Sequence, residues 1–468
     1  MRSLSTCATA LALTLLSLGA GRAEEQEGTF FNVLLQDGAD PWMIRHTDGW
    51  YYYTHTTGGD VTLWRSRTIS GLAAAERKVV WRPPAEGPAS KNLWAPELHF
   101  LDGAWYVYVA ADDGRNERHR MWVLENGHPD PFQGEWRLRG QLDDGSDRWA
   151  IDGTVFEAGG QRWFVWSGWE GAENVEQALY IARMDRPWRL ASGRVRIARP
   201  SLAWETNTRP RVNEGPQVVV RGDTIHLLYS ASGSWTDSYC LGLVTARVGA
   251  DLLDPRAWTK HPRPVFESGN GVFGPGHASL VPSPDGREEW LIYHAARFQG
   301  AGWTRCVRVQ RVSWGPNGLP DFGRPVAPDH PIPLPSGEPR RLRIEAEGAR
   351  LAGTARVVAE ASASGARKVG YVDTPESRLD LTVRAPRAGW YAVLARSGNG
   401  TGPDTWARYR LRVNLVWRRE LRVAPSGWNR WGTVGTRVWL RRGANQLRIT
   451  RLSGFAEWDC LDVLPLGR

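Results

Sequence analysis

The stretch Asp48-Gly49-Trp50-Tyr51-Tyr52-Tyr53 joins a two-residue turn to an aromatic strand, and the same pattern returns four more times. Asp-Gly and Gly-Asp pairs between β-like runs are hairpin signals, and aromatic residues favour the pleated surface of a sheet. Further units start at Asp102, Gly159, Gly222 and Asp285, which makes the repeat 54 to 63 residues long. A repeat of this length indicates one supersecondary unit that is used five times.

The content of each repeat predicts the architecture. Each aromatic strand is followed by one or two further β-like segments, and no 12-residue stretch has helical periodicity. Four short antiparallel strands repeated five times are typical of a five-bladed β-propeller, which we place at residues 30–335. The alternative is a sandwich or jelly roll with an accidental regularity. In either case the fold class is all-β, in agreement with 26 tryptophans and 51 glycines.

A change in amino-acid composition marks the start of a second domain. Prolines 331, 333, 335 and 339 alternate with small or polar residues, which predicts a stiff linker at residues 336–340. Residues 341–468 then contain short strands separated by glycine-rich turns. This pattern predicts a separate β-sandwich of the jelly-roll type.

The N-terminus has the features of an export signal. Arg2 precedes a short apolar run from Ala8 to Leu18, and a small-residue cleavage site follows near Ala23. Residues 1–23 are therefore predicted to be a signal peptide, and the mature protein to be extracellular or periplasmic. No later run reaches the roughly 18 apolar residues of a membrane helix, so we expect no membrane association.

Three cysteines, Cys240, Cys306 and Cys460, follow the predicted signal. In an exported protein they allow at most one intramolecular bridge, and whether Cys240 pairs with Cys306 stays open. Three are too few for a disulfide scaffold or a closed zinc site.

The net charge of +9 is unevenly distributed. From Arg340 onward the chain has 24 basic and 11 acidic residues, a balance of +13, so the preceding part sums to −4. No nucleic-acid-binding motif accompanies the excess, and we expect no nucleic-acid partner. A weak attraction of the C-terminal part to acidic polysaccharide is the milder inference.

One polar residue stands out on the strand before each hairpin turn. In a propeller the first strand of every blade lines the central channel, so residues at equivalent positions should converge at one end of it. Taken singly, Asp152 could belong to a turn, Asp40 could cap one, and a lone histidine usually has a structural role. The five residues of this series are Asp40, Glu97, Asp152, Glu214 and His277.

Several carboxyls around one cavity predict acid and base chemistry. Burial and mutual repulsion push their pKa values apart, so that one carboxyl keeps a proton while another stays ionised. Glycoside hydrolysis needs this division between a proton donor and a base or nucleophile. We interpret Glu97 as a supporting or structural residue.

Residues from about 30 to 335 resemble glycoside hydrolase family 43, whose members are five-bladed propellers that act on arabinan and xylan. The sequence of residues 91–96, 111–114 and 167–171 is most similar to that of bacterial exo-acting α-L-arabinofuranosidases. The motifs that carry the resemblance are Ala39-Asp40-Pro41-Trp42, Lys91-Asn92-Leu93-Trp94-Ala95-Pro96-Glu97, Trp149-Ala150-Ile151-Asp152-Gly153-Thr154, Val212-Asn213-Glu214-Gly215-Pro216 and Gly274-Pro275-Gly276-His277.

The resemblance implies a role for each matched residue. Asp40 corresponds to the general base, Glu214 to the general acid, and Asp152 to the residue that raises the pKa of the acid and orients it. It also implies inversion at the anomeric carbon, and a calcium or similar ion held in the channel through His277 and water. The candidates for stacking against sugar are Trp42, Trp94 and Trp169, with His277 beside them, although most tryptophans in a chain this rich in them pack internally.

The C-terminal part resembles carbohydrate-binding modules of families 6 and 35. The likeness lies in Arg343-Ile344-Glu345-Ala346-Glu347 and Trp458-Asp459-Cys460-Leu461-Asp462-Val463. It implies a structural calcium with Glu345, Glu347 and Asp459 as ligands, as the oxygen preference of Ca²⁺ requires. Two carboxylates alternating on an exposed strand are the simpler alternative. Tyr371, Trp406 and Trp428 are candidates for contact with sugar.

The sequence therefore predicts a secreted, monomeric, inverting glycoside hydrolase without an organic cofactor. Its expected substrate is arabinan or arabinose-substituted plant polysaccharide, from which it would release α-L-arabinofuranosyl residues. One alternative is the same machinery acting on another sugar, as a β-D-galactofuranosidase, a β-D-xylosidase or an endo-arabinanase. The other is a propeller that binds sugar without catalysis.

Overall fold

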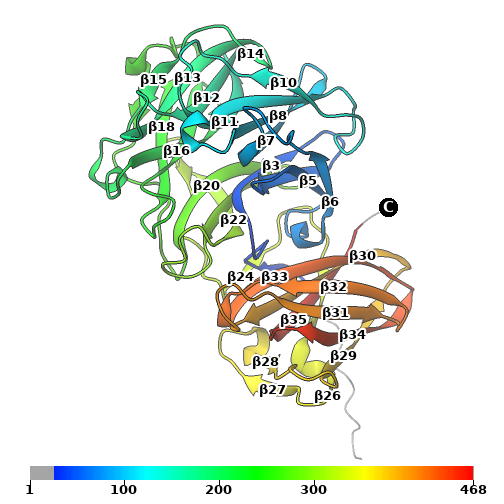
Figure 1. Ribbon diagram of the computed structural model, residues 1–468. Helices are drawn as coiled ribbons and strands as arrows, with labels where there is room; N and C mark the ends of the chain where they lie inside the picture. Colours follow the sequence, from blue (N-terminus) through cyan, green and yellow to red (C-terminus); the bar gives the residue numbers. More distant parts are fainter. Residues whose placement is uncertain (1–25, 467–468) are drawn as a thin grey trace, which may run out of the picture.

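A ring of five blades forms the larger part of the protein, as the sequence repeat predicts, and the all-β fold class is confirmed (Figure 1). The computed structural model describes residues 26–466, so the predicted signal peptide lies outside the described residues. Within each blade neighbouring strands pair antiparallel along the chain. The first two blades consist of β3 (Ala39–Arg45), β4 (Tyr51–Thr56), β5 (Val61–Ser66) and β6 (Glu76–Trp81), and of β7 (Lys91–Leu101), β8 (Ala104–Asp112), β9 (Arg120–Asn126) and β10 (Arg137–Gln141).

The remaining three blades repeat this arrangement. A two-residue parallel pairing between β13 and β16 joins the third blade to the fourth. Their strands are β11 (Ala150–Ala158), β12 (Gln161–Gly168), β13 (Glu176–Arg186), β14 (Arg189–Leu190) and β15 (Val195–Ala198); β16 (Arg211–Arg221), β17 (Thr224–Ala231), β18 (Cys240–Arg247) and β19 (Thr259–Lys260); and β20 (Phe273–Pro282), β21 (Glu289–Ala296), β22 (Arg305–Trp314) and β23 (Pro320–Asp321).

The chain closes the ring by returning to its own beginning. Strand β2 (Thr29–Phe31) pairs with β24 (Pro331–Pro333), and Leu35 bridges to Val307 in the last blade. The buried side chain of Asn32 bonds to both the carbonyl and the amide of Val309. These contacts fix the first blade against the fifth.

The C-terminal domain is a β-sandwich, as predicted. One sheet contains β1 (Gln26–Glu27), β25 (Arg341–Glu345), β27 (Arg356–Ala359), β28 (Arg367–Gly370), β30 (Gly389–Asn399), β33 (Gly427–Leu440) and β35 (Glu457–Pro465). The other contains β26 (Arg350–Ala352), β29 (Arg378–Ala385), β31 (Ala407–Val413), β32 (Trp417–Val423) and β34 (Gly443–Ser453).

Short 3₁₀ turns are the helical elements of the described residues. None of these turns has the length or the apolar character needed to cross a bilayer. They are η1 (Leu72–Ala74), η2 (Asn116–Arg118), η3 (Ala203–Glu205), η4 (Pro255–Ala257), η5 (Ala346–Gly348) and η6 (Ser364–Ala366).

The two domains share a hydrophobic core. Leu72 and Ala73 of η1 belong to the same buried cluster as Ala392 and Leu394 of the sandwich. Gly435 in β33 allows this approach, because a Cβ at that position would lie 2.6 Å from the Ala73 backbone. The propeller and the sandwich are therefore packed directly against each other (Figure 1).

The segment between the domains is also fixed in place. The carboxylate of Glu338 accepts hydrogen bonds from the backbone amides of Ile69 and Ser70, at 2.6 and 3.1 Å. A few residues later, buried Arg341 forms an ion pair of 3.1 Å with Asp462.

Candidate active site

The innermost strand of every blade is irregular at one level, meaning at one height along the central channel. Its pairing register shifts there, and one residue takes a positive φ between 42° and 57°. Such a bulge re-aims the neighbouring side chains, which explains how residues on a strand can point along the channel. At this level the residues with positive φ are Asp40, Ala95, Asp152, Gly215 and His277, while β7 and β20 each have a second one, Asn92 and Gly274.

This level corrects the predicted series in two blades. In the second blade the bulge falls on Ala95, and Glu97 lies two residues further into the strand. Glu97 is buried and its Oε2 is 3.0 Å from His99 Nε2, which fits a supporting role. In the fourth blade the positive φ falls on Gly215, which as a glycine adopts it at little energetic cost, and Glu214 is the residue before it.

Asp40 is held as a carboxylate by its surroundings. Thr56 Oγ1 donates a hydrogen bond of 2.6 Å to Oδ2, and Arg305 Nη1 and His277 Nδ1 lie 3.2 and 3.3 Å from Oδ1. Burial alone would raise its pKa, but His277, Arg305 and Thr56 together lower the pKa of Asp40 below its usual value. Asp40 is therefore ionised at neutral pH.

The backbone of Asp40 is positioned by a neutral histidine. Its amide donates a hydrogen bond of 2.9 Å to His294 Nδ1. Burial, with Arg305 and His277 nearby, places the pKa of His294 well below the usual value, so that Nδ1 is available as an acceptor. The ring of Tyr239 stacks on His294, at 5.6 Å between centroids.

Glu214 has the opposite ionisation behaviour. It is buried, and Tyr239 donates a hydrogen bond of 2.8 Å to its Oε1. Burial raises the pKa of Glu214 to about 7, with the negative charge of Asp40 acting in the same direction and Tyr239 and Arg305 opposing it. A proton is thus available on this carboxyl near neutral pH.

Asp152 is near both of these carboxyls, whose charges act on it. Its Oδ2 accepts a hydrogen bond of 3.0 Å from the Gly215 amide and is 3.9 Å from His277 Nδ1. Burial and the charges of Glu214 and Asp40 raise the pKa of Asp152. The structure therefore brings Asp40, Asp152 and His277 together and ties Asp152 to the backbone next to Glu214.

Several residues of the site are absent from the sequence prediction. Arg305, Tyr239, Thr56 and His294 lie on the second or third strand of a blade or next to its end, whereas the prediction considered only the strand before each hairpin turn.

The three predicted stacking tryptophans are largely covered. Trp42 is 6% exposed and donates from its indole to the Leu98 carbonyl at 2.9 Å. Trp169 is 3% exposed and stacks on Trp149, whereas half-buried Trp94 stacks on His119 at 3.9 Å between centroids.

An exposed tryptophan is linked to the candidate site through Ser234. Trp303 is 69% exposed, and its indole donates to Ser234 Oγ at 3.2 Å. Ser234 in turn hydrogen-bonds Glu214, and its carbonyl accepts from Arg305 Nη2 at 3.0 Å. Trp303 and its edge-on neighbour Trp235 thus lie next to the site.

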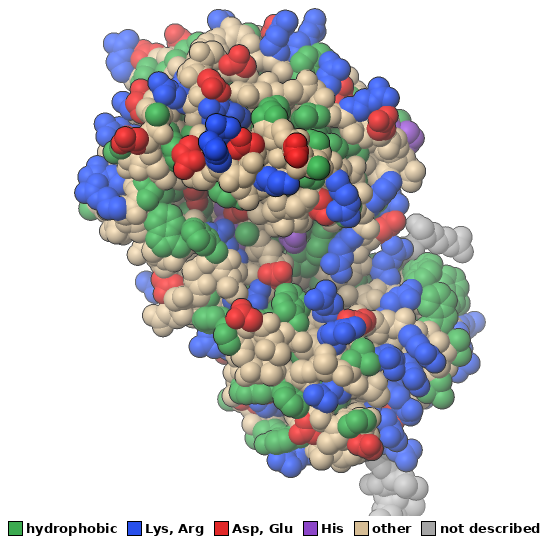
Figure 2. All heavy atoms as spheres, viewed as in Figure 1, with side chains coloured by type: hydrophobic (Ala, Val, Ile, Leu, Met, Phe, Trp, Pro, Cys, Tyr) green, Lys and Arg blue, Asp and Glu red, His purple; other side chains and the backbone are tan. Residues whose placement is uncertain are grey.

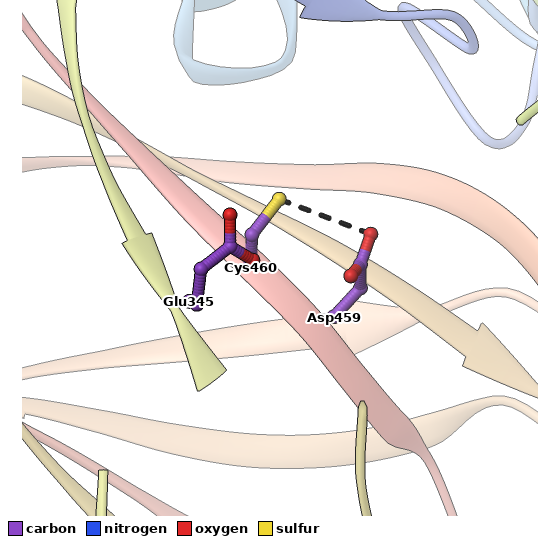
Figure 3. A group of neighbouring side chains, drawn as sticks. All are labelled: Glu345, Asp459 and Cys460. Carbon is purple, nitrogen blue, oxygen red and sulfur yellow. Dashed lines mark hydrogen bonds between the residues drawn. The ribbon is translucent and has the colours of Figure 1, made fainter. Parts of the chain in front are cut away.

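Two of the predicted calcium ligands meet in the sandwich. Figure 3 shows Glu345 on β25 beside Asp459 and Cys460 on β35, and their ligand atoms lie within 4.8 Å of one another. The pKa of Glu345 is raised to about 7 and that of Asp459 to about 6, mainly by burial. Arg396 forms an ion pair with Asp459.

Glu347 faces the same region. A Cβ at Gly365 would lie 3.1 Å from Glu347 Oε1, and the adjacent Ser364 donates to Glu345 Oε1 at 2.8 Å. Oε2 of Glu345 is buried and has no hydrogen-bond partner among the described residues. Oxygen donors with such an unsatisfied atom fit a calcium ion, although Arg396 already neutralises part of the charge. His277 belongs to no cluster of three potential ligands among the described residues.

The three cysteines of the described residues are free and buried. Cys240 and Cys306 therefore form no bridge, which answers the question left open by the sequence.

A five-bladed propeller that holds one ionised carboxyl near another that keeps a proton has the arrangement that a glycoside hydrolase needs. The family model of glycosyl hydrolases family 43 matches residues 32–320, and the chain belongs to this family. The chain is 36% identical to an α-L-arabinofuranosidase of Humicola insolens over 390 residues, which is 81% of this chain and 78% of that protein.

Two further relatives are similar. An extracellular exo-α-(1→5)-L-arabinofuranosidase of Streptomyces avermitilis is 39% identical over 332 residues, 68% of each chain. The crystal structure of an α-L-arabinofuranosidase from Lactobacillus brevis superposes with a TM-score of 0.61 at 36% identity, covering 64% of this chain and 98% of that one. The predicted family and enzyme class are thus confirmed.

Proposed function

We propose that the protein is an inverting α-L-arabinofuranosidase in which Asp40 is the general base and Glu214 the general acid. The observation that carries this proposal is the opposite ionisation of the two groups. Interactions with Arg305, His277 and Thr56 keep Asp40 charged, and burial keeps a proton on Glu214. An inverting glycosidase needs this combination at one pH.

The reaction follows from these states. Glu214 transfers its proton to the glycosidic oxygen as the bond from that oxygen to the anomeric carbon breaks. Asp40 takes a proton from a water molecule, whose oxygen attacks the anomeric carbon from the opposite face and inverts its configuration. Asp152 holds the backbone beside Glu214 through the Gly215 amide, and the two carboxyls repel each other when both are ionised.

The sugar is proposed from the relatives. Three of them, at 36 to 39% identity, are called arabinofuranosidases, and two of these are called extracellular and exo-acting. The same carboxyls could serve a β-D-galactofuranoside or a β-D-xyloside, and fold does not choose among them.

Two measurements test this proposal. The nitrophenyl glycosides of α-L-arabinofuranose, β-D-galactofuranose and β-D-xylose should show a preference for the first, and NMR of the first product should show the inverted anomer. Glu214→Gln should lower kcat by about 10²- to 10⁴-fold. Unchanged turnover in this variant would favour a propeller that only binds sugar.

We propose that the sandwich binds the polysaccharide. A groove of about 460 Å³ on this domain is lined by Tyr371 and Trp428, which are 48% and 49% exposed, and by polar Lys368, Asn429 and Glu457. Exposed aromatic faces beside hydrogen-bonding groups suit a sugar ring. Loss of polymer binding in Trp428→Ala, with hydrolysis of the nitrophenyl arabinoside unchanged, would support this role.

Calcium in the sandwich is part of the same proposal. When bound, it would supply positive charge to Glu345, Glu347 and Asp459 and would link β25 to β35. An ion in the channel would take one nitrogen from His277 and most of its ligands from water, and the reaction above does not depend on it. We further propose export after cleavage near Ala23 and a monomeric state.

A further inference from the structure

A second groove, of about 350 Å³, lies between the two domains. Phe273, Arg297 and Arg308 of the propeller line it together with Asn429 and Arg430 of the sandwich. Figure 2 shows the molecule hollowed at the junction of the domains, with Lys and Arg side chains gathered there and on the lower domain. Asn429 lines both this groove and the one beside Tyr371 and Trp428, and the rest of the two linings differs.

Arg308 is an unusual feature of this groove. Its side chain is buried, with 4% of the residue exposed, and its Nη1 has no hydrogen-bond partner among the described residues. It lies beside the Cys306 thiol, and no carboxylate of the described residues forms an ion pair with it. A buried charge without a partner is unfavourable. An anion bound in the groove would supply the partner that this guanidinium lacks.

Arg297 adds a second buried guanidinium. It joins the two domains, because Nη1 donates to the Pro425 carbonyl at 3.0 Å while Nη2 pairs with Asp37 at 2.8 Å. Its Nε is buried without a partner among the described residues. With exposed Arg430 the lining has three arginines and one carboxylate, Asp329, so the groove favours a negative ligand.

The groove adjoins the catalytic carboxyls. Arg297 Nη2 also donates to the carbonyl of Arg305, whose side chain contacts Asp40. Phe273 begins β20, the strand that carries His277. A polymer with its terminal sugar at Asp40 and Glu214 would therefore place a neighbouring sugar over the groove.

We infer that this interdomain groove binds a carboxylate-bearing sugar, a uronic acid residue of the polymer that the active site trims. The inference rests on the proposed function and specifies its substrate class. Arginine binds a carboxylate through two parallel hydrogen bonds, and the remaining lining of Ser362, Ser426 and Asn429 suits sugar hydroxyls. The volume is that of a site for a sugar rather than for an isolated ion.

The test compares one polymer with and without its carboxyls. Arabinose-substituted xylan that carries glucuronic acid, and the same xylan after chemical reduction of its carboxyls to alcohols, are used as substrates of the full chain. We expect kcat/KM for arabinose release to be about fivefold or more higher on the acidic polymer. In Arg308→Gln and Arg430→Gln the ratio should fall towards one, with hydrolysis of the nitrophenyl arabinoside unchanged.

Arg442→Gln is the matched control, because Arg442 is exposed in the turn after β33 and outside the groove lining. It should keep the wild-type ratio. Arg308→Lys tests geometry, since it keeps the charge but loses the two-pronged contact, and its ratio should lie between those of wild type and Arg308→Gln. If Arg308 variants do not fold, as judged by thermal unfolding, the ratio of kcat/KM values measured for Arg430→Gln still tests the inference.

Calorimetry with a xylo-oligosaccharide that carries one glucuronic acid separates this inference from the proposed function. Binding that is lost in Arg430→Gln supports the groove even if no arabinoside is hydrolysed. Equal kcat/KM on both polymers, or a ratio that neither variant changes, would overturn the inference. A third result would also overturn the inference: free glucuronate binds in a way that needs the arginines but does not compete with the acidic polymer. The groove would then be a site for a small organic acid.

Discussion

Arg305 Nη1 lies 3.2 Å from Asp40 Oδ1, so the proposed base is paired with a buried guanidinium from the opposite end of the propeller sequence. This pair depends on closure of the ring, because β3 and β22 belong to the first and the last blade. The Asn32 contacts to Val309 and the β2–β24 pairing that close the ring therefore also position the base.

The first prediction concerns this pair. Arg305→Gln should raise the pKa of Asp40, because it removes a positive charge that favours the carboxylate. A hydrogen bond to a charged group contributes about 1.5 to 3 kcal/mol, which corresponds to roughly one pKa unit or more. The acidic limb of the kcat/KM profile should move up by about that amount. Arg311→Gln, an exposed change on the same strand, should leave the profile in place.

A second prediction concerns Asp152 and the alkaline limb, which reports loss of the proton from Glu214. Asp152 and Glu214 repel each other when both are ionised. Asp152→Asn removes that repulsion, so the pKa of Glu214 should fall and the alkaline limb should move to lower pH. A limb that stays in place, with only kcat reduced, would assign Asp152 a positioning role through Gly215.

Stability should respond to Glu214 in a pH-dependent way. Its pKa rises from 4.5 in the unfolded chain to about 7 in the folded one, so folding is opposed increasingly as pH rises through this window. At pH 8 the penalty is on the order of 3 kcal/mol. Glu214→Gln should therefore raise Tm at pH 8 and leave it nearly unchanged at pH 4.5. An equal effect at both pH values would contradict the proposed protonation.

Calcium should stabilise the sandwich. Adding Ca²⁺ to chelator-treated protein should raise Tm by several degrees, because the ion would bind the folded carboxyls of Glu345 and Asp459 and not the unfolded chain. Glu345→Gln should remove the response. Glu420→Gln on β32, an exposed acidic residue outside the cluster, should preserve it.

A site residue could be predicted from the sequence where a polar residue recurs at the same position in successive blades. Asp40, Asp152 and His277 recur in step with the blades, and the bulge of each inner strand gives them the same backbone conformation. Spacing alone could not show that the second bulge falls on Ala95 rather than Glu97, because a one- or two-residue shift leaves the period intact.

Several residues that contact Asp40 and Glu214 are missing from the prediction based on the repeat. Arg305 and Tyr239 reach the site from the start of the third strand of their blades, a position that the predicted series on the innermost strands does not include. The tryptophans illustrate the same limit. Motif position favoured Trp42, which the interface between the first two blades covers, whereas Trp303 is exposed beside the site.

Trp303 therefore gives the last prediction. Its exposed ring stands next to Ser234, which contacts both Arg305 and Glu214, so a sugar bound at these groups would reach the ring face. Trp303→Ala should raise KM for arabinan oligosaccharides about three- to tenfold with kcat nearly unchanged, because stacking contributes about 0.5 to 1.5 kcal/mol beyond buried area. Trp417→Ala, which removes a tryptophan that is 41% exposed on the sandwich, should leave KM for these short substrates as in wild type. An effect on kcat alone in Trp303→Ala would instead indicate that the ring orients Ser234 and, through it, the proton donor.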